Sequence, residues 1–350
     1  MKIIFSSGDC SETRLCYAKQ LGADGVSVNT GTLSGYAETG HATLEMLANL
    51  KTTIESHGLS FLTLRIGNSD IHGVLYNTPE KDREIDNICR TIRAAGEAEI
   101  SFVYYNLTPW RSLDTAWPDT PSAPELRSDD LRHGSGPGRY YRPDGRGDAT
   151  LLTHTTSRVQ EDVGRTPEAE VAPYGQISAD EMWERTAYLY ERIVPVAEEA
   201  GVNIGAHPND PPEPVYRGVE QNLNTVDGLK RLVDLVPSPR NGLLLCLGTL
   251  HEMGDDTMAA IEYFLQHKKI FHIHFRNPAG TLPNGYYQED FLDEGDLDML
   301  EVMRLLKKYD YQGFIDPDHA IGIAGDEGGK IGFAWELGYI KALRDVVLKE

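Results

Sequence analysis

Metal-binding residue types recur at the ends of short apolar segments in the second half of the chain. His207 and Cys246 each end such a segment, a third segment carries His272 and His274, and a fourth leads into residues 316–318, which begin and end with aspartate. Taken singly, a histidine or cysteine in such a place is more often a buried core residue. If the four segments are neighbouring strands of one sheet, however, two imidazoles, a thiolate and a carboxylate converge at one edge. That donor set suits manganese, iron, cobalt or zinc better than magnesium or calcium, which prefer oxygen ligands.

Spacing ranks the residues of the third segment. His272 and His274 are two residues apart, so both side chains point to the same face of a strand. His274 is nearer the carboxyl end and is expected to reach the metal, whereas His272 is expected to be a buried neighbour. Arg276 lies two residues further on the same face. A guanidinium beside the metal is suited to hold a carboxylate through two parallel hydrogen bonds.

The fourth segment offers two carboxylates and an adjacent proton-transfer group. Either Asp316 or Asp318 can supply the metal ligand, and His319 directly follows Asp318. The pKa of a histidine ordinarily lies near neutral pH, so His319 is a candidate general acid or base. The pattern predicts metal-assisted chemistry on a small molecule.

The elements that must position these residues follow from the hydrophobic pattern, in which short apolar runs alternate with longer amphipathic segments. The predicted strands are Lys2–Ser6, Gly25–Asn29, Phe61–Arg65, Ile100–Asn106, Asn203–Ala206, Gly242–Cys246, Ile270–Phe275 and Gly313–Asp316. The predicted helices are Ser11–Leu21, His41–His57, Pro79–Gly96, Ser178–Ala200, Thr225–Leu235, Asp255–Gln266, Asp296–Lys308 and Gly332–Leu348. Eight strands, each followed by a helix, predict an α/β fold, a closed (β/α)8 TIM barrel, in which the ends of strands five to eight are adjacent. No G-x-G-x-x-G motif follows the first strand, which argues against a dinucleotide-binding sheet.

Residues 107–176 interrupt this alternation. The segment is rich in Pro, Gly, Arg and Asp and shows almost no apolar periodicity. Because it follows the fourth strand, it leaves from the end of the barrel where active sites are assembled. We expect a single barrel domain over residues 1–350 with an inserted loop region at 107–176, which is either a lid over the substrate or a surface insertion.

The net charge of the chain limits the classes of binding partner that are expected. The 350 residues carry 33 Lys and Arg against 54 Asp and Glu, a formal net charge of −21. Such a surface repels phosphate backbones and anionic lipid, so neither nucleic acid nor a membrane is an expected partner. No apolar run is long enough for a membrane span or a secretory signal, and the four cysteines show no C-x-x-C spacing, so a cytoplasmic protein with reduced thiols is expected. A divalent cation and Arg276 would supply positive charge for an anionic substrate.

At these residues the sequence resembles the mannonate dehydratase family, a branch of the xylose-isomerase-like barrels. The matching runs are ordered along the chain: Tyr104 to Pro109 resembles the family's YNxxP, His207 to Pro212 its HPDDPP, Ser238 to Leu250 its SPxNGxxxCxGSL, His274 to Asn277 its HxRN, Glu289 with Asp293 to Met299 its glutamate loop and GDxDM helix start, and Pro317 to His319 its PDHG. The resemblance covers most of the chain and is strongest from Gly201 to His319.

The resemblance implies roles for individual residues. The metal ligands would be His207, Cys246, His274 and Asp318, and the metal manganese, with iron, cobalt or zinc as other candidates; Arg276 would hold the substrate and His319 would serve as acid or base. The implied reaction is that of a hydro-lyase of carbohydrate metabolism, the loss of water from D-mannonate to give 2-keto-3-deoxy-D-gluconate. A small sugar acid would be the substrate, and a homo-oligomer, a dimer or larger, is expected.

The sequence also departs from the family pattern. Asp316 replaces an arginine, Ala320 and Ile321 replace Gly-Arg, and Phe333 stands where the family has a tyrosine, for which Tyr339 is a candidate substitute. These departures leave two alternatives open: a metal-dependent isomerase, epimerase or lyase acting on a neutral or keto sugar, and a non-catalytic relative that binds metal or sugar.

Overall fold

The computed structural model describes residues 1–108, 138–142, 145–155, 175–216, 218–318 and 320–350. Eight parallel strands close into a barrel in the order β1, β2, β3, β4, β7, β10, β11, β14 and back to β1. Their bounds are β1 Lys2–Ser7, β2 Gly25–Asn29, β3 Ser60–Arg65, β4 Phe102–Asn106, β7 Asn203–His207, β10 Asn241–Cys246, β11 Ile270–His274 and β14 Phe314–Asp316. The predicted TIM barrel is therefore confirmed, and each predicted strand lies where the apolar pattern placed it.

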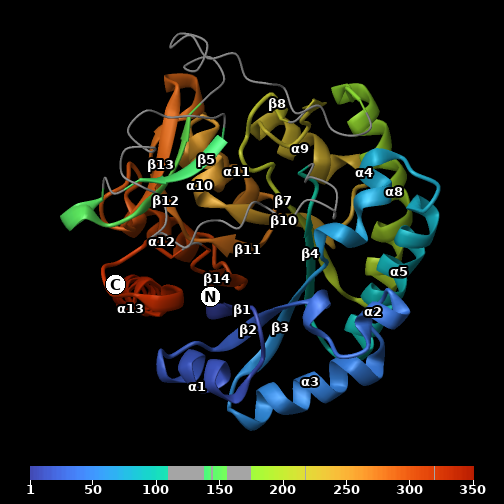
Figure 1. The fold of residues 1–350 in the computed structure, drawn as a ribbon, viewed down its shortest axis with the longest axis horizontal. Coiled ribbons are helices and arrows are strands. Elements are labelled where there is room, and N and C mark those ends of the chain that lie inside the picture. Colours follow the sequence, from blue (N-terminus) through green and yellow to red (C-terminus); the bar gives the residue numbers. More distant parts are fainter. Residues whose placement is uncertain (109–137, 143–144, 156–174, 217, 319) are drawn as a thin grey trace.

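Helices cover the outside of the barrel (Figure 1). The longer ones are α1 Glu12–Gln20, α3 Leu44–Ser56, α5 Lys81–Glu97, α8 Ala179–Ala200, α9 Val226–Leu235, α11 Thr257–Gln266, α12 Met299–Lys308 and α13 Lys330–Val347. Each coincides with a predicted helix to within a few residues. At the start of α8, the Ser178 side chain accepts a hydrogen bond from the Glu181 amide and the Glu181 carboxylate accepts one from the Ser178 amide, the expected capping box.

Short helices, among them α4 His72–Tyr76 and α10 Leu247–Glu252, escaped prediction because so few residues show no periodicity.

Two apolar layers fix which way each strand side chain points. A small cluster fills the barrel interior with Ile4, Leu62, Phe102, Tyr104, Leu244 and Phe314. A much larger cluster packs the outer face of the strands against the helices and includes Phe61 and Leu64 of β3 together with Leu47 and Ile54 of α3. Because side chains alternate between these faces, inward-pointing residues at the carboxyl ends of the strands must meet over the interior cluster.

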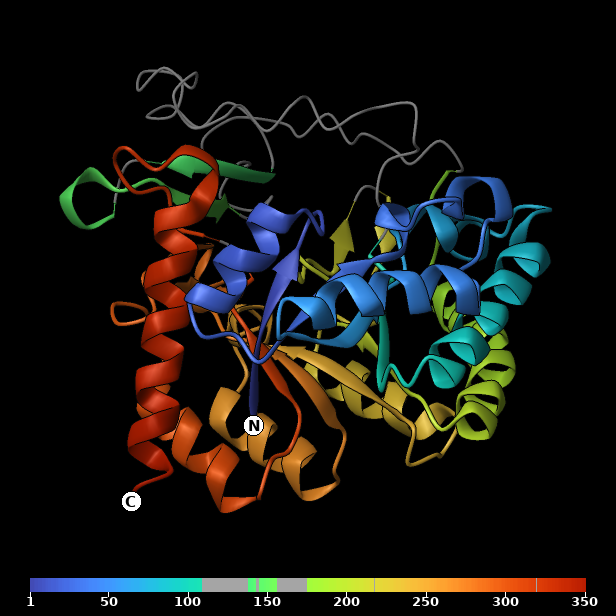
Figure 2. The ribbon, with the colours of Figure 1, turned by 90° about the horizontal axis from the view of Figure 1, so that it is seen from below.

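A second, antiparallel sheet lies beside this end of the barrel. Its order is β12 Asn277–Thr281, β13 Tyr286–Asp290, β6 Leu151–Thr155 and β5 Gly138–Arg142. In Figure 2, β5 and β6 lie at the end of the molecule toward which β1 points. The expectation that residues 107–176 form a loop was therefore wrong for β5 and β6, which pair with β13 from a distant part of the chain. Residues 109–137 and 156–174, which the prediction also covered, lie outside the described residues.

None of the helices in the described part of the chain combines the length and the apolar character needed to cross a membrane.

Candidate metal and active site

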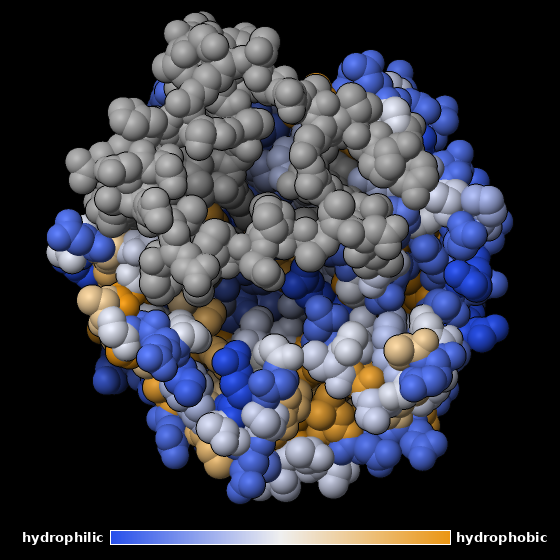
Figure 3. Space-filling view, in the orientation of Figure 1, coloured by the Kyte–Doolittle hydropathy of each residue, from blue (hydrophilic) through white to orange (hydrophobic). Residues whose placement is uncertain are grey.

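Four side chains from four neighbouring strands meet at the carboxyl end of the barrel. His207, Cys246 and His274 are the last residues of β7, β10 and β11, and Asp318 follows β14 by two residues. One ligand atom from each lies within 4.8 Å of the other three. Figure 3 looks onto this face and shows hydrophilic residues around a hollow. The structure thus brings together the four residues expected to bind a metal.

The two histidines of the cluster are buried and close together, with ring centroids 5.1 Å apart. His207 has its Nδ1 2.7 Å from the carbonyl oxygen of Pro208, so Nδ1 carries the proton and Nε2 is left as a lone-pair donor for a cation. Burial lowers the pKa of His207, which favours this neutral form. His274 has its Nδ1 3.3 Å from Oδ2 of Asp318.

The thiol of Cys246 lies in surroundings that favour its thiolate. Burial opposes ionisation, but the Arg276 guanidinium and hydrogen bonds with His207 and His274 outweigh it, so the pKa of Cys246 lies well below its ordinary value. The Arg276 Nη2 is 2.8 Å from Sγ. Sγ also accepts a hydrogen bond of 3.4 Å from the Thr249 amide, at the start of α10. A thiolate is the form of cysteine that binds metal.

The side chain of Arg276 is buried, and carboxylates surround its guanidinium. Nη2 is 3.1 Å from Asp210, Nη1 is 3.4 Å from Glu252 and also pairs with Glu289, and Nε is 3.2 Å from Asp318. All three guanidinium nitrogens are therefore engaged by protein groups. The expected role of Arg276 in holding a substrate carboxylate stays a prediction.

The charge around this arginine is unbalanced. Its acidic partners are Cys246, Asp210, Glu252, Glu289 and Asp318. Burial opposes the charged form of His274, but the carboxylates of Asp318 and Asp316 raise its pKa well above the ordinary value, so His274 adds a second positive charge. Two positive charges still cannot neutralise five such groups in a buried site, where an uncompensated charge is costly. Two imidazoles, a thiolate and a carboxylate within reach of one point are, in addition, a donor set typical of a borderline transition metal. The residues present thus fit a divalent cation of that class.

A second layer of polar groups lies below the cluster. The Nε2 of His272 is 2.7 Å from Oδ1 of Asp316, and the Ser6 hydroxyl donates to Oδ2 of the same carboxylate at 2.5 Å. His272 is fully buried, as the spacing predicted, and does not belong to the four-residue cluster. Asp316 thus serves as a hydrogen-bond acceptor that orients neighbouring side chains.

Of the other expected catalytic residues, Tyr339 is described and is not among the four clustered side chains. His319 lies outside the described residues. Tyr339 is on α13, where its ring stacks on Trp335 with centroids 5.4 Å apart, and Phe333 on the same helix packs edge-on against Phe5. Burial and the charges of nearby carboxylates raise the pKa of Tyr339. Its participation in proton transfer stays a prediction.

Sequence reasoning overlooked two acidic partners of Arg276. Asp210 lies in the run that begins at His207, and Glu252 lies on α10. The spacing carried a signal for Glu252, because Thr249 and Glu252 are three residues apart and share one face of a helix. Thr249 Oγ1 accepts a hydrogen bond from Arg276 at 2.8 Å, so this face does point into the site.

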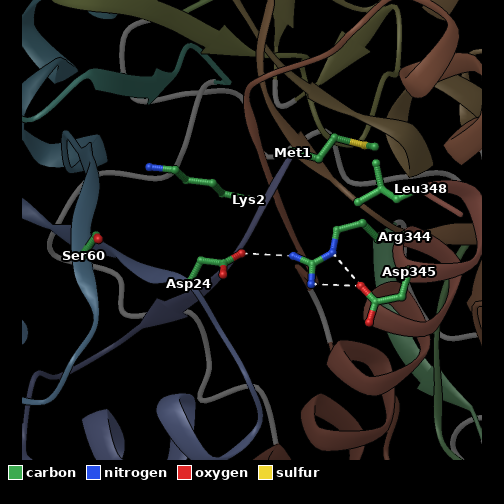
Figure 4. A pocket seen from close by; sticks show the side chains of 7 residues that line it. All are labelled: Met1, Lys2, Asp24, Ser60, Arg344, Asp345 and Leu348. Carbon is green, nitrogen blue, oxygen red and sulfur yellow. Dashed lines mark hydrogen bonds and ion pairs between the residues drawn. The ribbon is translucent and has the colours of Figure 1, made fainter.

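A separate pocket of about 410 Å³ lies at the opposite end of the barrel (Figure 4). Three of its charged side chains are paired with one another, since Arg344 contacts Asp24 at 3.1 Å and Asp345 at 3.2 Å. Active sites of such barrels lie at the carboxyl ends of the strands, which places this pocket away from the candidate site.

Comparisons with known proteins identify the family of the chain. The model of the family described as "D-mannonate dehydratase (UxuA)" matches residues 1–348. A mannonate dehydratase of Streptococcus suis (strain 05ZYH33) is 30% identical over 298 residues, which cover 81% of this chain and 76% of that protein. A mannonate dehydratase of Enterococcus faecalis (strain ATCC 700802 / V583) is 29% identical over 342 residues, 91% of this chain and 90% of that protein.

Solved structures also resemble this chain. The crystal structure of mannonate dehydratase from Streptococcus suis serotype 2 superposes with a TM-score of 0.78 at 25% identity and covers 100% of this chain and 94% of that chain. A D-psicose 3-epimerase reaches a TM-score of 0.58 at 13% identity, with 100% of both chains covered. That second likeness shows a shared fold alone.

Proposed function

Because the chain belongs to the D-mannonate dehydratase family, a family of hydro-lyases, we propose that it removes water from D-mannonate with the help of a divalent metal held at the strand ends. The product would be 2-keto-3-deoxy-D-gluconate. The observation that supports the proposal is the convergence of His207, Cys246, His274 and Asp318 in a chain of this family. No observation favours the isomerase or the non-catalytic alternative.

The metal and the protein groups have separate tasks in this proposal. A divalent metal bound by the four side chains would supply Lewis acidity toward the substrate carboxylate and its C2 hydroxyl. Arg276 keeps Cys246 ionised and holds Asp318 from one side, because its nitrogens lie 2.8 Å and 3.2 Å from these side chains. The Nδ1 hydrogen bond of His207 to the Pro208 carbonyl fixes the orientation of the imidazole ring.

Proton transfer is assigned to His319. The reaction needs a base for the proton on C2 and an acid for the departing hydroxyl on C3, and a histidine beside a metal ligand can serve as either. His319 follows the ligand Asp318 directly in the sequence.

The experiment that tests the proposal is a turnover assay. The purified protein is stripped with a chelator, reloaded with Mn²⁺ and incubated with D-mannonate, and the 2-keto-3-deoxy product is followed. Activity is expected with the wild type and absent with His319→Ala, which should still bind Mn²⁺ by elemental analysis. Failure of the reloaded wild type to form a 2-keto-3-deoxy acid from mannonate or related aldonates would contradict the proposal.

Three further features are proposed with this function. Manganese is the proposed metal, with iron, cobalt and zinc as the other candidates suited to the donor set. The cytoplasm is the proposed location, since all four cysteines are free, which is usual for proteins of a reducing compartment. A homo-oligomer is the proposed assembly, and sedimentation of the purified protein would determine its size.

A further inference from the structure

One arginine at the mouth of the barrel has no partner in the described structure. Arg65 is the last residue of β3 and is only partly buried. Among the residues that the structure describes, no ion pair or side-chain hydrogen bond involves its guanidinium, whereas Arg276 is paired on every nitrogen. A cation that the protein leaves unpaired at the active end of a barrel is available to an anionic ligand.

The side chain of Arg65 points into the barrel mouth. Leu64 belongs to the outer cluster between strands and helices, so the next residue along the strand faces inward. Arg65 is also level with Tyr104 in the register of β3 and β4. Tyr104 itself belongs to the interior cluster, and its hydroxyl is 2.9 Å from the hydroxyl of Ser27 inside the barrel.

Tyr104 lies between Arg65 and the metal-binding cluster. Its ring lies 5.5 Å from the ring of His272 and 6.5 Å from that of His274. Burial raises the pKa of Tyr104, and the positive charges of Arg65 and His274 both oppose that rise, so both charges act on the same phenol oxygen. Arg65 and the metal ligands therefore border the same space above Tyr104, on different sides of it.

The loop that follows β14 supplies no arginine of its own. Asp316 stands where relatives were expected to have an arginine, and its carboxylate is bound by His272 and Ser6. Ala320 and Ile321 follow where Gly-Arg was expected. A sugar acid in this mouth thus meets the unpaired Arg65 on β3, across Tyr104 from the metal ligands.

We propose that Arg65 binds the substrate carboxylate through a charge-assisted hydrogen bond and so selects an acid over a neutral sugar. This inference rests on the proposed function, since it names the group that recognises the carboxylate of the same substrate. In this proposal Arg276 pairs with the residues of the metal-binding cluster, and Arg65 contacts the substrate. The fork of a guanidinium suits a carboxylate and is more weakly hydrated than an ammonium, which favours arginine at this place.

The test separates binding of the carboxylate from turnover. The ligands are the 3-deoxy analogue of D-mannonate, which lacks the leaving hydroxyl, and its uncharged amide. Their dissociation constants are measured by calorimetry on Mn²⁺-loaded wild type, Arg65→Gln and Arg90→Gln. Arg90 is an exposed arginine of α5, so its variant changes the net charge equally without touching the site.

The wild type and Arg90→Gln should prefer the acid over the amide by roughly 10- to 100-fold, the value expected of one charge-assisted contact. Arg65→Gln should lose most of that preference while its affinity for the amide stays within about threefold. For D-mannonate itself, the KM should rise more than kcat falls. Arg65→Lys should restore part of the preference, which guards against a folding defect in the glutamine variant.

The inference would be overturned if Arg65→Gln retained the preference for the acid, or if the wild type bound acid and amide equally. A wild type that discriminates through Arg65 but forms no product from D-mannonate would contradict only the proposed reaction. In that case Arg65 would still be the carboxylate-binding residue, and the substrate would be another sugar acid.

Discussion

Replacement of Arg276 by methionine tests whether the carboxylates around it depend on its charge. The side chains are similar in length, but methionine removes every contact that the guanidinium makes with Asp210, Glu252 and Glu289. These carboxylates would remain buried and close together without a counter-charge. Loss of one partner from a buried ion pair costs about 3–5 kcal/mol.

This cost converts into a shift of the melting temperature. Unfolding entropy near 60 °C is about 2.1 cal/mol/K per residue, so 350 residues give roughly 0.7 kcal/mol/K. A loss of 3–5 kcal/mol therefore lowers the melting temperature of the metal-free protein by about 4–7 °C. Addition of Mn²⁺ should narrow the gap, because a divalent cation in the same cluster replaces part of the missing positive charge.

The assay is thermal unfolding of wild type and variant, each in chelator and in Mn²⁺. Arg304→Met is the matched control, because Arg304 pairs with Glu301 and Glu350 at the surface and its loss should shift the melting temperature little. The reasoning is refuted if Arg276→Met melts with the wild type in chelator, or if Mn²⁺ widens the difference between them.

Three further predictions concern the ligand set, a buried acid and the second sheet. Cys246→Ser should lower the bound metal measured by elemental analysis while the circular dichroism spectrum is kept, since a hydroxyl is a poorer ligand than a thiolate; unchanged metal content would contradict the assignment. Burial raises the pKa of Glu336 well above its ordinary value, so the folded protein keeps a proton that the unfolded chain releases, and stability falls as pH rises between the two pKa values. Glu336→Gln should flatten that fall in urea unfolding, and an unaltered slope would exclude Glu336 as its source. Glu213→Ala removes the partner 2.9 Å from His154 on β6, so amide exchange in β6 should accelerate by roughly tenfold, whereas an unchanged rate would show that pairing with β5 and β13 is enough to hold this strand.

The sequence predicted the barrel because its signal is local. Each strand is a short apolar run between turn residues, and a parallel sheet needs no further pattern. The depth argument that ranked His274 above His272 uses only the period of a strand, and the register of β11 places His274 level with Cys246 and Asp316. The four candidate ligands could be placed together because strand order in such a barrel follows chain order.

The remaining features depend on contacts between distant segments. The sheet of β5, β6 and β13 joins strands whose pairing no local period reveals. The surroundings of Arg276 and the missing partner of Arg65 are likewise properties of the folded mouth. Residue type alone suggests that any arginine near a metal can hold a substrate, and the contacts show which one is already engaged.

The hydrogen bond from Ser6 to Asp316 joins the first strand of the barrel to the last. In a chain still emerging from the ribosome, His207, Cys246 and His274 are present before β14 has been made, but Asp318 is not. Three donor side chains on an open sheet bind a metal more weakly and less selectively than four in a closed barrel. If the four residues bind the metal as proposed, capture of the ion is deferred until the barrel has closed, and a chain cut short before its last strand stays without a complete site.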